Sequence, residues 1–274
     1  IELILGELCI ILNQIDEGIK YLKIGSEQNL SEAQYMLGLM YLEHENINDC
    51  IKYLTLASNQ NYLLAQIKLG FVYLIKLNEF NKAFIYLKLA ADQNDSCAQF
   101  YIGNYYLGLN FFSENNLLIS CEFIIDFVEF IKSNKNIDFD KGIYYLTKSA
   151  KQNIFIAQLQ LGILYIFDMH IPHDYDKGIY YLTLAAKQNN SIAQILLGAQ
   201  YLDEDIKKGE MYLKSISKSN DAFIQVFLGF YYKKSGKIHE SIHFLESIAK
   251  FNLPEVLLSL GDIFSNKKNK DFDM

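Results

Sequence analysis

The stretch KQNNSIAQILLGAQYL, residues 187–202, decides the fold, because close copies of it stand at four other places in the chain. The copies are EQNLSEAQYMLGLMYL from residue 27, NQNYLLAQIKLGFVYL from 59, DQNDSCAQFYIGNYYL from 92 and KQNIFIAQLQLGILYI from 151. Weaker copies extend the series, and its glycines align at Gly6, Gly38, Gly70, Gly103, Gly162, Gly198, Gly229 and Gly261. Apart from gaps of 59 and 36 residues, the glycines are 31 to 33 residues apart. A repeat of this period is typical of a solenoid.

Each copy predicts a first helix, helix A, with one buried face. The residue before the glycine is always Leu or Ile, the fifth before it is usually Ala, and the third after it is usually Tyr. Counted from the glycine, positions −5, −1 and +3 fall on one side of a helix. A second apolar run follows each A helix, such as GIYYL at 142 and again at 178, and predicts helix B.

The glycine itself calls for an explanation, since glycine inside a helix costs about 1 kcal/mol relative to alanine. We expect helix B to cross helix A closely at this point, and its own small residue, such as Gly142 or Gly178, to serve the same purpose. Asp138 and Asp174 precede B helices and are expected to cap them. An asparagine such as Asn153 follows each B helix and is expected to end it in the left-handed conformation.

The segments AQYMLGLMY (33–41) and AQLQLGILY (157–165), with DYDKGIYYLTLAAKQN (174–189), resemble Sel-1-like repeats, a branch of the tetratricopeptide-like helical hairpins. The resemblance covers nearly all of residues 1–274 as a single array of about eight repeat units. It implies an all-α fold, a right-handed α-α superhelix (solenoid) of antiparallel helix pairs. It also implies a non-enzymatic scaffold or adaptor that holds other proteins together, and we expect no cofactor.

Three departures from the family pattern affect the loops. Most copies are shorter than usual, the glycine-rich turn between the helices is missing, and asparagine stands where the family commonly has glycine. The chain begins at position −5 of a helix A, and DFDM at 271–274 matches DFDK at 138, so both ends cut a repeat. We therefore expect a longer array.

Composition restricts the partners. A formal charge of −7 and a pI near 5.3 oppose nucleic acid as a partner, because its binding depends on clustered Lys and Arg. We also expect no membrane span, because glutamates interrupt the apolar opening segment. The cysteines are too widely spaced for a zinc site or a regular disulfide framework; they are Cys9, Cys50, Cys97 and Cys121. This spacing favours a reducing compartment, so we expect an intracellular, cytoplasmic protein.

The histidines offer the only alternative to a non-enzymatic scaffold function. The loop 168–174 carries ligand types suited to zinc, at Asp168, His170, His173 and Asp174. A solvated turn with Asp174 as a helix cap explains the same residues. His239 and His243 are one helical turn apart but lack a third ligand. A metal-dependent or enzymatic module using the 168–174 loop is therefore the alternative function, and the metal content of the purified protein distinguishes the two.

Two repeated polar columns admit both a ligand and a packing interpretation. Tyrosines at +3 and in helix B could line an aromatic channel, and glutamines at −4 could contact a ligand. Because both columns recur in nearly every copy, we expect the tyrosines to be interhelix core. We expect the glutamines to form a hydrogen-bonded ladder between neighbouring repeats.

Function is expected where the copies differ, at positions −2 and +1. In stacked hairpins of this kind helix A lines the concave surface, so these positions form a natural groove for a partner peptide or helix. The alternative is that they vary because nothing constrains them. The candidate partner-binding residues on the A helices are Lys68, Phe71, Tyr101, Asn104, Gln160 and Ile163.

The 59-residue gap contains a predicted helical insertion at residues 110–137 in the fourth repeat. Its segment LLISCEFIIDFVEFIK, 117–132, is apolar except for one narrow acidic stripe, so a helix here must bury most of its surface. It is too short and too charged to span a bilayer. We expect it to dock on the solenoid, on a protein partner or on a second copy through self-association, with Phe123, Phe127 and Phe130 as candidate contacts.

Overall fold

The structure is a computed structural model that describes residues 1–12, 14–108, 138–167, 174–201, 205–214, 216–218 and 222–272. These residues form two compact units, unit 1 up to Ile154 and unit 2 from Phe155 onward, and each is described by itself. Throughout the described ranges the regular elements are helices, as the repeat pattern predicts. That the chain forms one array of about eight repeat units stays a prediction.

Helices A and B alternate along both units. The A helices of unit 1 are α1 (Glu2–Ile11), α3 (Ser31–Glu43), α5 (Leu63–Phe71) and α7 (Ser96–Tyr106). Its B helices are α2 (Ile15–Glu27), α4 (Ile47–Asn59), α6 (Phe80–Asp92) and α9 (Phe139–Lys151). The A helices of unit 2 are α10 (Phe155–Phe167), α12 (Ser191–Gln200), α14 (Ala222–Lys234) and α16 (Pro254–Phe272). Its B helices are α11 (Tyr175–Lys187), α13 (Ile206–Leu213) and α15 (Ile238–Ile248), and α15 runs into a 3-10 turn, η2 (Ala249–Phe251).

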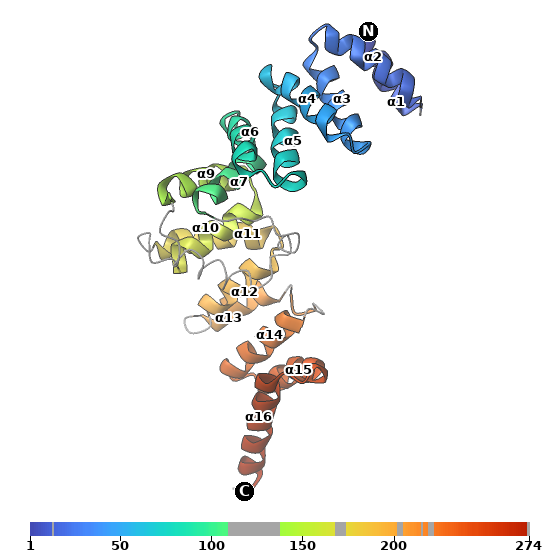
Figure 1. Ribbon diagram of the computed structural model, residues 1–274. Helices are drawn as coiled ribbons and strands as arrows, with labels where there is room; N and C mark the ends of the chain where they lie inside the picture. Colours follow the sequence, from blue (N-terminus) through green and yellow to red (C-terminus); the bar gives the residue numbers. More distant parts are fainter. Residues whose placement is uncertain are drawn as a thin grey trace. The chain divides into compact units, whose positions relative to one another are not determined.

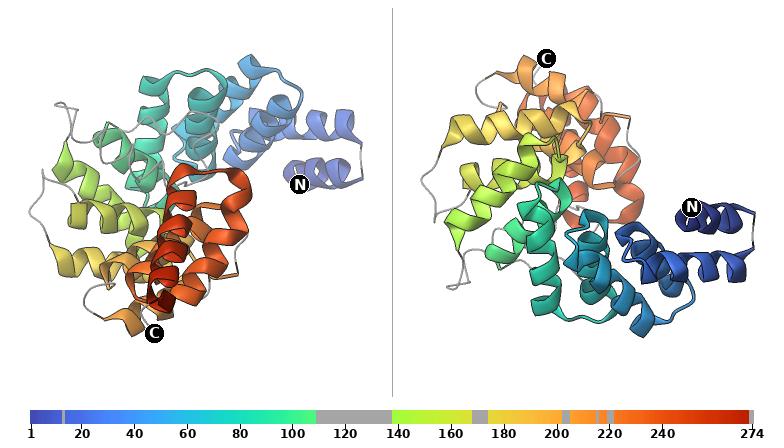
Figure 2. Two further views of the ribbon diagram at one scale, coloured as in Figure 1. Left: turned by 90° about the horizontal axis from the view of Figure 1, so that it is seen from below. Right: turned by 90° about the horizontal axis from the view of Figure 1, so that it is seen from above.

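Each B helix packs against the A helix before it, as Figure 1 shows for α3 with α4 and for α10 with α11. The two views of Figure 2 show the same pairing in the two dark blue helices nearest the N-terminus, α1 and α2. These pairs are the antiparallel hairpins that the two alternating sequence patterns predict. The fold class is therefore confirmed as an all-α hairpin repeat.

Close helix crossing explains the repeated glycine. A Cβ atom on Gly38 would lie 2.6 Å from Leu54 Cδ2 in α4, and one on Gly162 would lie 2.6 Å from Leu182 Cδ2 in α11. The equivalent leucine of helix B crowds the glycine in five further hairpins, at Gly6, Gly70, Gly103, Gly198 and Gly229. The exception is Gly261 in α16, where a Cβ atom would meet nothing within 4 Å. The predicted crossing is confirmed at the other seven positions.

The 33-residue spacing after Gly70 has its own structural counterpart. Helix α5 continues as a π-helix, η1 (Val72–Lys76), before the turn into α6. A π-helical hydrogen bond spans one residue more than an α-helical bond. The extra residue of this repeat is therefore accommodated within the helix, and the turn that follows keeps its position.

The tyrosine columns pack on one another inside six of the described hairpins. Tyr41 of α3 stacks on Tyr53 of α4 with ring centroids 5.5 Å apart, and Tyr106 of α7 stacks on Tyr145 of α9 at 5.9 Å. Lys141 places its Nζ atom 5.2 Å from the Tyr106 ring centroid. The expected interhelix packing is confirmed, and it recurs at Tyr73–Tyr86, Tyr165–Tyr181, Tyr201–Tyr212 and Tyr232–Phe244.

The glutamine column forms the expected ladder. Gln60, at the end of α4, donates from Nε2 to Gln34 Oε1 of α3 at 2.7 Å and to Asn29 Oδ1 of the preceding loop at 3.2 Å. Gln34 itself donates from Nε2 to Ser26 O of α2 at 3.4 Å, which joins neighbouring repeats. We call each bond between a loop glutamine and a −4 glutamine a glutamine rung. Further rungs are Gln93–Gln66 at 2.7 Å, Gln152–Gln99 at 2.9 Å and Gln188–Gln158 at 2.8 Å.

The helix ends also follow the sequence. Asp138 and Asp174 accept hydrogen bonds from the backbone N–H of Lys141 and Lys177, each at 3.1 Å, and so cap α9 and α11. Hydrogen bonds from the Lys141 and Lys177 side chains, together with these backbone bonds, hold the pKa of both carboxyl groups below its usual range. Left-handed asparagines follow the B helices as predicted, at Asn29, Asn61, Asn94, Asn153, Asn189 and Asn252.

Candidate functional site

The predicted partner-binding residues of unit 1 lie on two neighbouring A helices. Lys68 and Phe71 belong to α5, and Tyr101 and Asn104 belong to α7. Lys68, Phe71 and Tyr101 are partly exposed. Asn104 is buried, and its Nδ2 atom donates to Phe100 O of the same helix at 2.9 Å. Three of these four side chains are therefore within reach of a partner.

Phe71 and Tyr101 form a continuous aromatic surface across the two helices. Their rings meet edge to face, with centroids 5.0 Å apart and an interplanar angle of 81°. Tyr101 also meets Phe100 at 5.4 Å. Burial raises the pKa of the Tyr101 hydroxyl, so this group stays protonated and can donate a hydrogen bond at neutral pH. We call Lys68, Phe71 and Tyr101 the α5–α7 patch.

The predicted residues of unit 2 have a different environment. Gln160 and Ile163 of α10 are both fully buried. The amide oxygen and nitrogen of Gln160 have no hydrogen-bond partner among the described residues. The structure therefore places these two residues in the interior, and their role as partner contacts stays a prediction.

The remaining predicted sites are only partly within the described residues. The insertion at 110–137, with Phe123, Phe127 and Phe130, lies outside them, as do Asp168, His170 and His173. Asp174 is described and caps α11, as one of the two interpretations expects. His239 and His243 are both exposed on α15. Among the described residues, no group of three or more His, Cys, Asp or Glu side chains is placed to hold a metal ion.

With this geometry in place, the comparisons with known proteins identify the repeats. A family model described as Sel1 repeat matches residues 31–62, 63–95, 135–154 and 156–190. The chain contains four Sel1 repeats. Sel1 repeats commonly mediate protein–protein interaction, and the family is generally non-catalytic.

Two crystal structures are similar to this Sel1-repeat chain. One is a Sel1 repeat protein from Oxalobacter formigenes, with a TM-score of 0.57 and 18% identity over 89% of this chain and 98% of the other. The second is a protective antigen present in uropathogenic Escherichia coli strains, which displays an SLR fold. Its TM-score is 0.51 with 20% identity, and the match covers 92% of this chain but 60% of the antigen. At these identities the likeness shows the fold alone. The comparison with curated proteins finds no match.

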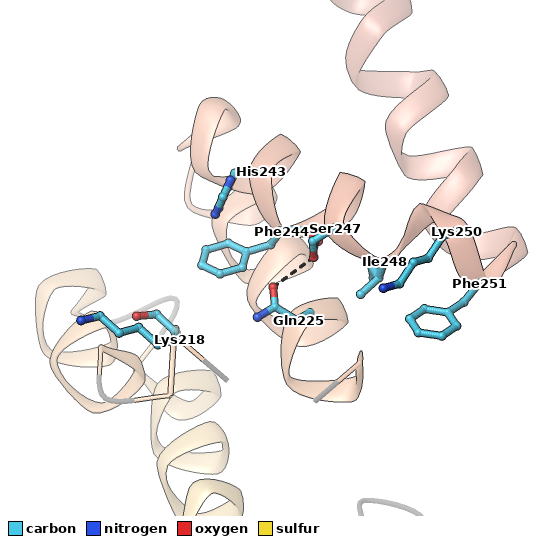
Figure 3. Close-up of a pocket in the computed structure, with 9 residues that line it drawn as sticks. Lys218, Gln225, His243, Phe244, Ser247, Ile248, Lys250 and Phe251 are labelled. Atoms are coloured by element: carbon cyan, nitrogen blue, oxygen red, sulfur yellow. Dashed lines mark hydrogen bonds between the residues drawn. The ribbon is translucent and has the colours of Figure 1, made fainter. Parts of the chain in front are cut away.

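Unit 2 also contains a hollow of about 570 Å³ that the sequence analysis did not predict. Figure 3 shows its lining, which comes from the segment after α13, from α14, from α15 and from η2. The signal that could have revealed it is the tripeptide KFN at 250–252, where the loops at 151 and 187 read KQN. Phe251 replaces a loop glutamine, so the rung that would fill this space is absent.

Proposed function

We propose that this Sel1-repeat protein is a non-enzymatic scaffold that binds a protein partner on the α5–α7 patch. The observation that carries the proposal is the contrast between packed and variable positions. The glycine and leucine positions make the helix crossing in seven hairpins, and the glutamine positions make rungs in four of them. Lys68, Phe71 and Tyr101 differ from their counterparts in other repeats and are partly exposed on adjacent A helices.

The composition of the patch suits a protein partner. Aromatic side chains are enriched at protein interfaces, because a large rigid ring buries much apolar area with little loss of conformational entropy. The Tyr101 hydroxyl can direct one hydrogen bond, and the Lys68 ammonium favours a partner with an acidic side chain. An amphipathic helix or an extended segment would satisfy both features.

Two further parts of the proposal rest on the sequence. The insertion at 110–137, through Phe123, Phe127 and Phe130, is a predicted second contact for a partner or a second copy. An intracellular location, in the cytoplasm, is proposed from the cysteine spacing. Cys9, Cys50 and Cys97 form no disulfide, and no helix in the described part of the chain has the length and apolar character needed to cross a bilayer.

Affinity capture from native source material with matched variants tests the patch. We expect Lys68→Glu and Tyr101→Ala each to remove a set of polypeptides that the wild-type chain retains. Tyr180→Ala is the control, because Tyr180 is 57% exposed and belongs to the B helix α11, not to either helix that carries the patch. Thermal melts by circular dichroism confirm that each variant is folded. Identical capture by the folded patch variants and the wild type would contradict the proposal.

A further inference from the structure

The hollow in unit 2 lies where a glutamine rung is missing. In a complete hairpin such as α7–α9, Gln152 donates from Nε2 to Gln99 Oε1 at 2.9 Å and to Asn94 O of the preceding loop at 3.1 Å. In hairpin α14–α15 the −4 glutamine is Gln225, and Phe251 occupies the position of the loop glutamine. A phenyl ring cannot donate either bond, and Gln225 Oε1 accepts from Ser247 Oγ at 3.2 Å instead.

Lysines from two consecutive loops border this hollow. The residue before the loop glutamine position is Glu27, Asn59 or Asp92 in the first three loops and lysine in the last four, at Lys151, Lys187, Lys218 and Lys250. Two of these lysines, Lys218 and Lys250, line the hollow. Figure 3 shows Lys218 on one side of it and Lys250 with Phe251 on the other.

The charges of the hollow are unbalanced. Its nine lining residues include two lysines and no acidic residue. Lys82, Lys141 and Lys177 pair with a carboxylate on the preceding turn, at 2.6 to 2.8 Å. Neither Lys218 nor Lys250 has a carboxylate within 4.0 Å among the described residues, and the contact of Lys250 is with the Phe251 ring, 5.2 Å from Nζ to the centroid. Two ammonium groups around one hollow in an acidic chain attract a negatively charged ligand.

The remaining lining residues restrict the ligand further. Ser247, Gln225 and the exposed His243 supply polar groups, while Phe244 and the 54% exposed Phe251 supply rings. A volume of about 570 Å³ accommodates a few side chains, not a folded surface. Carboxylates can accept charge-assisted hydrogen bonds from the lysines, and an adjacent apolar side chain can cover Phe251.

We infer that this hollow binds an acidic segment of a protein partner, with glutamate or aspartate carboxylates between Lys218 and Lys250 and an apolar side chain against Phe251. The inference rests on the proposed scaffold function in taking the ligand to be a protein segment. It concerns a different unit of the chain and none of the residues of the α5–α7 patch. The broken rung creates the space, and the two lysines select the charge.

Fluorescence anisotropy of the full chain with a labelled peptide, Glu-Glu-Phe-Glu-Glu-Gly, tests the inference. We expect binding that weakens with added sodium chloride and that is lost when glutamine replaces each glutamate of the peptide. Lys218→Gln and Lys250→Gln should each weaken binding about tenfold. The matched controls are Lys151→Gln and Lys187→Gln, at the same repeat position beside complete rungs, and these should bind as the wild type does.

Phe251→Gln supplies a second, independent test. It restores the loop glutamine, whose side chain should bond to Gln225 and fill the hollow, so binding should fall at least tenfold while the melting temperature is unchanged or raised. The inference is overturned if the wild type does not bind the peptide, if the glutamine peptide or a single-stranded oligonucleotide binds as tightly, or if the control lysines matter equally. Lys68→Glu should leave peptide binding unchanged, so failure here is distinguishable from failure of the α5–α7 patch.

Discussion

Hairpin α7–α9 in unit 1 and hairpin α14–α15 in unit 2 share the same helix crossing. Gly103 and Gly229 occupy equivalent places, and a Cβ atom on either would approach the Cγ atom of the opposing leucine to 2.9 and 2.6 Å. Each hairpin also has one stacked ring pair, with centroids 5.9 Å apart in α7–α9 and 5.5 Å apart in α14–α15. The crossing is therefore maintained in both units.

The two hairpins differ at their loop edge. Gln152 closes the rung of α7–α9 on Gln99, whereas Phe251 leaves the equivalent place in α14–α15 open. Both hairpins nevertheless keep a buried core leucine from helix B, Leu146 and Leu245. The fold therefore depends on the crossing, and the rung adds stability without being required. Where the rung is absent, the edge is available for recognition.

The largest loss of stability is expected from disturbing the helix crossing, which the two hairpins share. Gly103→Leu and Gly229→Leu should each lower the free energy of unfolding by about 3 kcal/mol, because the new side chain overlaps the leucine of helix B. Chemical denaturation followed by circular dichroism measures the loss. Gly261→Leu is the control, since its Cβ atom meets nothing within 4 Å and leucine favours a helix more than glycine does. Equal losses at all three positions would show that the crossing is not the cause.

A smaller loss of stability is expected from removing the glutamine rung, which α7–α9 has and α14–α15 lacks. Gln152→Ala removes the donor to the buried Gln99 Oε1 atom and should cost about 1 to 2 kcal/mol. Phe251→Ala, at the equivalent position of the open hairpin, should change stability by no more than about 0.5 kcal/mol, because the ring is 54% exposed. Denaturant titrations of both variants measure the difference. If Phe251→Ala destabilised as much as Gln152→Ala, the open edge would be part of the core.

The smallest effect concerns the turn between helices A and B. Gly236 supplies a left-handed residue there before α15, with φ of 77°, and Gly108 does so after α7, with φ of 70°. Glu45, before α4, adopts φ of 56° although it carries a side chain. Glu45→Gly should therefore raise the free energy of unfolding by about 0.5 to 1 kcal/mol. Gly236→Glu should lower it by a similar amount, and thermal melts check both signs. A destabilised Glu45→Gly variant would mean that the Glu45 side chain stabilises the turn.

Much of the fold could be read from the sequence because packing repeats with the period of the chain. The glycine crossing and the stacked rings recur in nearly every described hairpin, and glutamine rungs form in four of them, so packing explains these columns. The candidate site was harder, because it lies where copies differ, and a difference alone does not show exposure. Lys68 and Phe71 are partly exposed, whereas Gln160 and Ile163, at the same repeat positions, are fully buried.

The sequence by itself determined the hairpins, the residues at which helices cross, and the left-handed asparagines that end the B helices, since each depends on local spacing within one repeat. The tertiary structure decided which variable side chains reach the surface and where a rung is left open. Both depend on residues distant in the chain that the fold brings together. Phe71 contacts Tyr101, and Lys218 lines the same hollow as residues of the α14–α15 hairpin. The sequence shows that Phe251 stands where other loops have a glutamine. Only the positions of the residues that face it show that this replacement leaves a hollow.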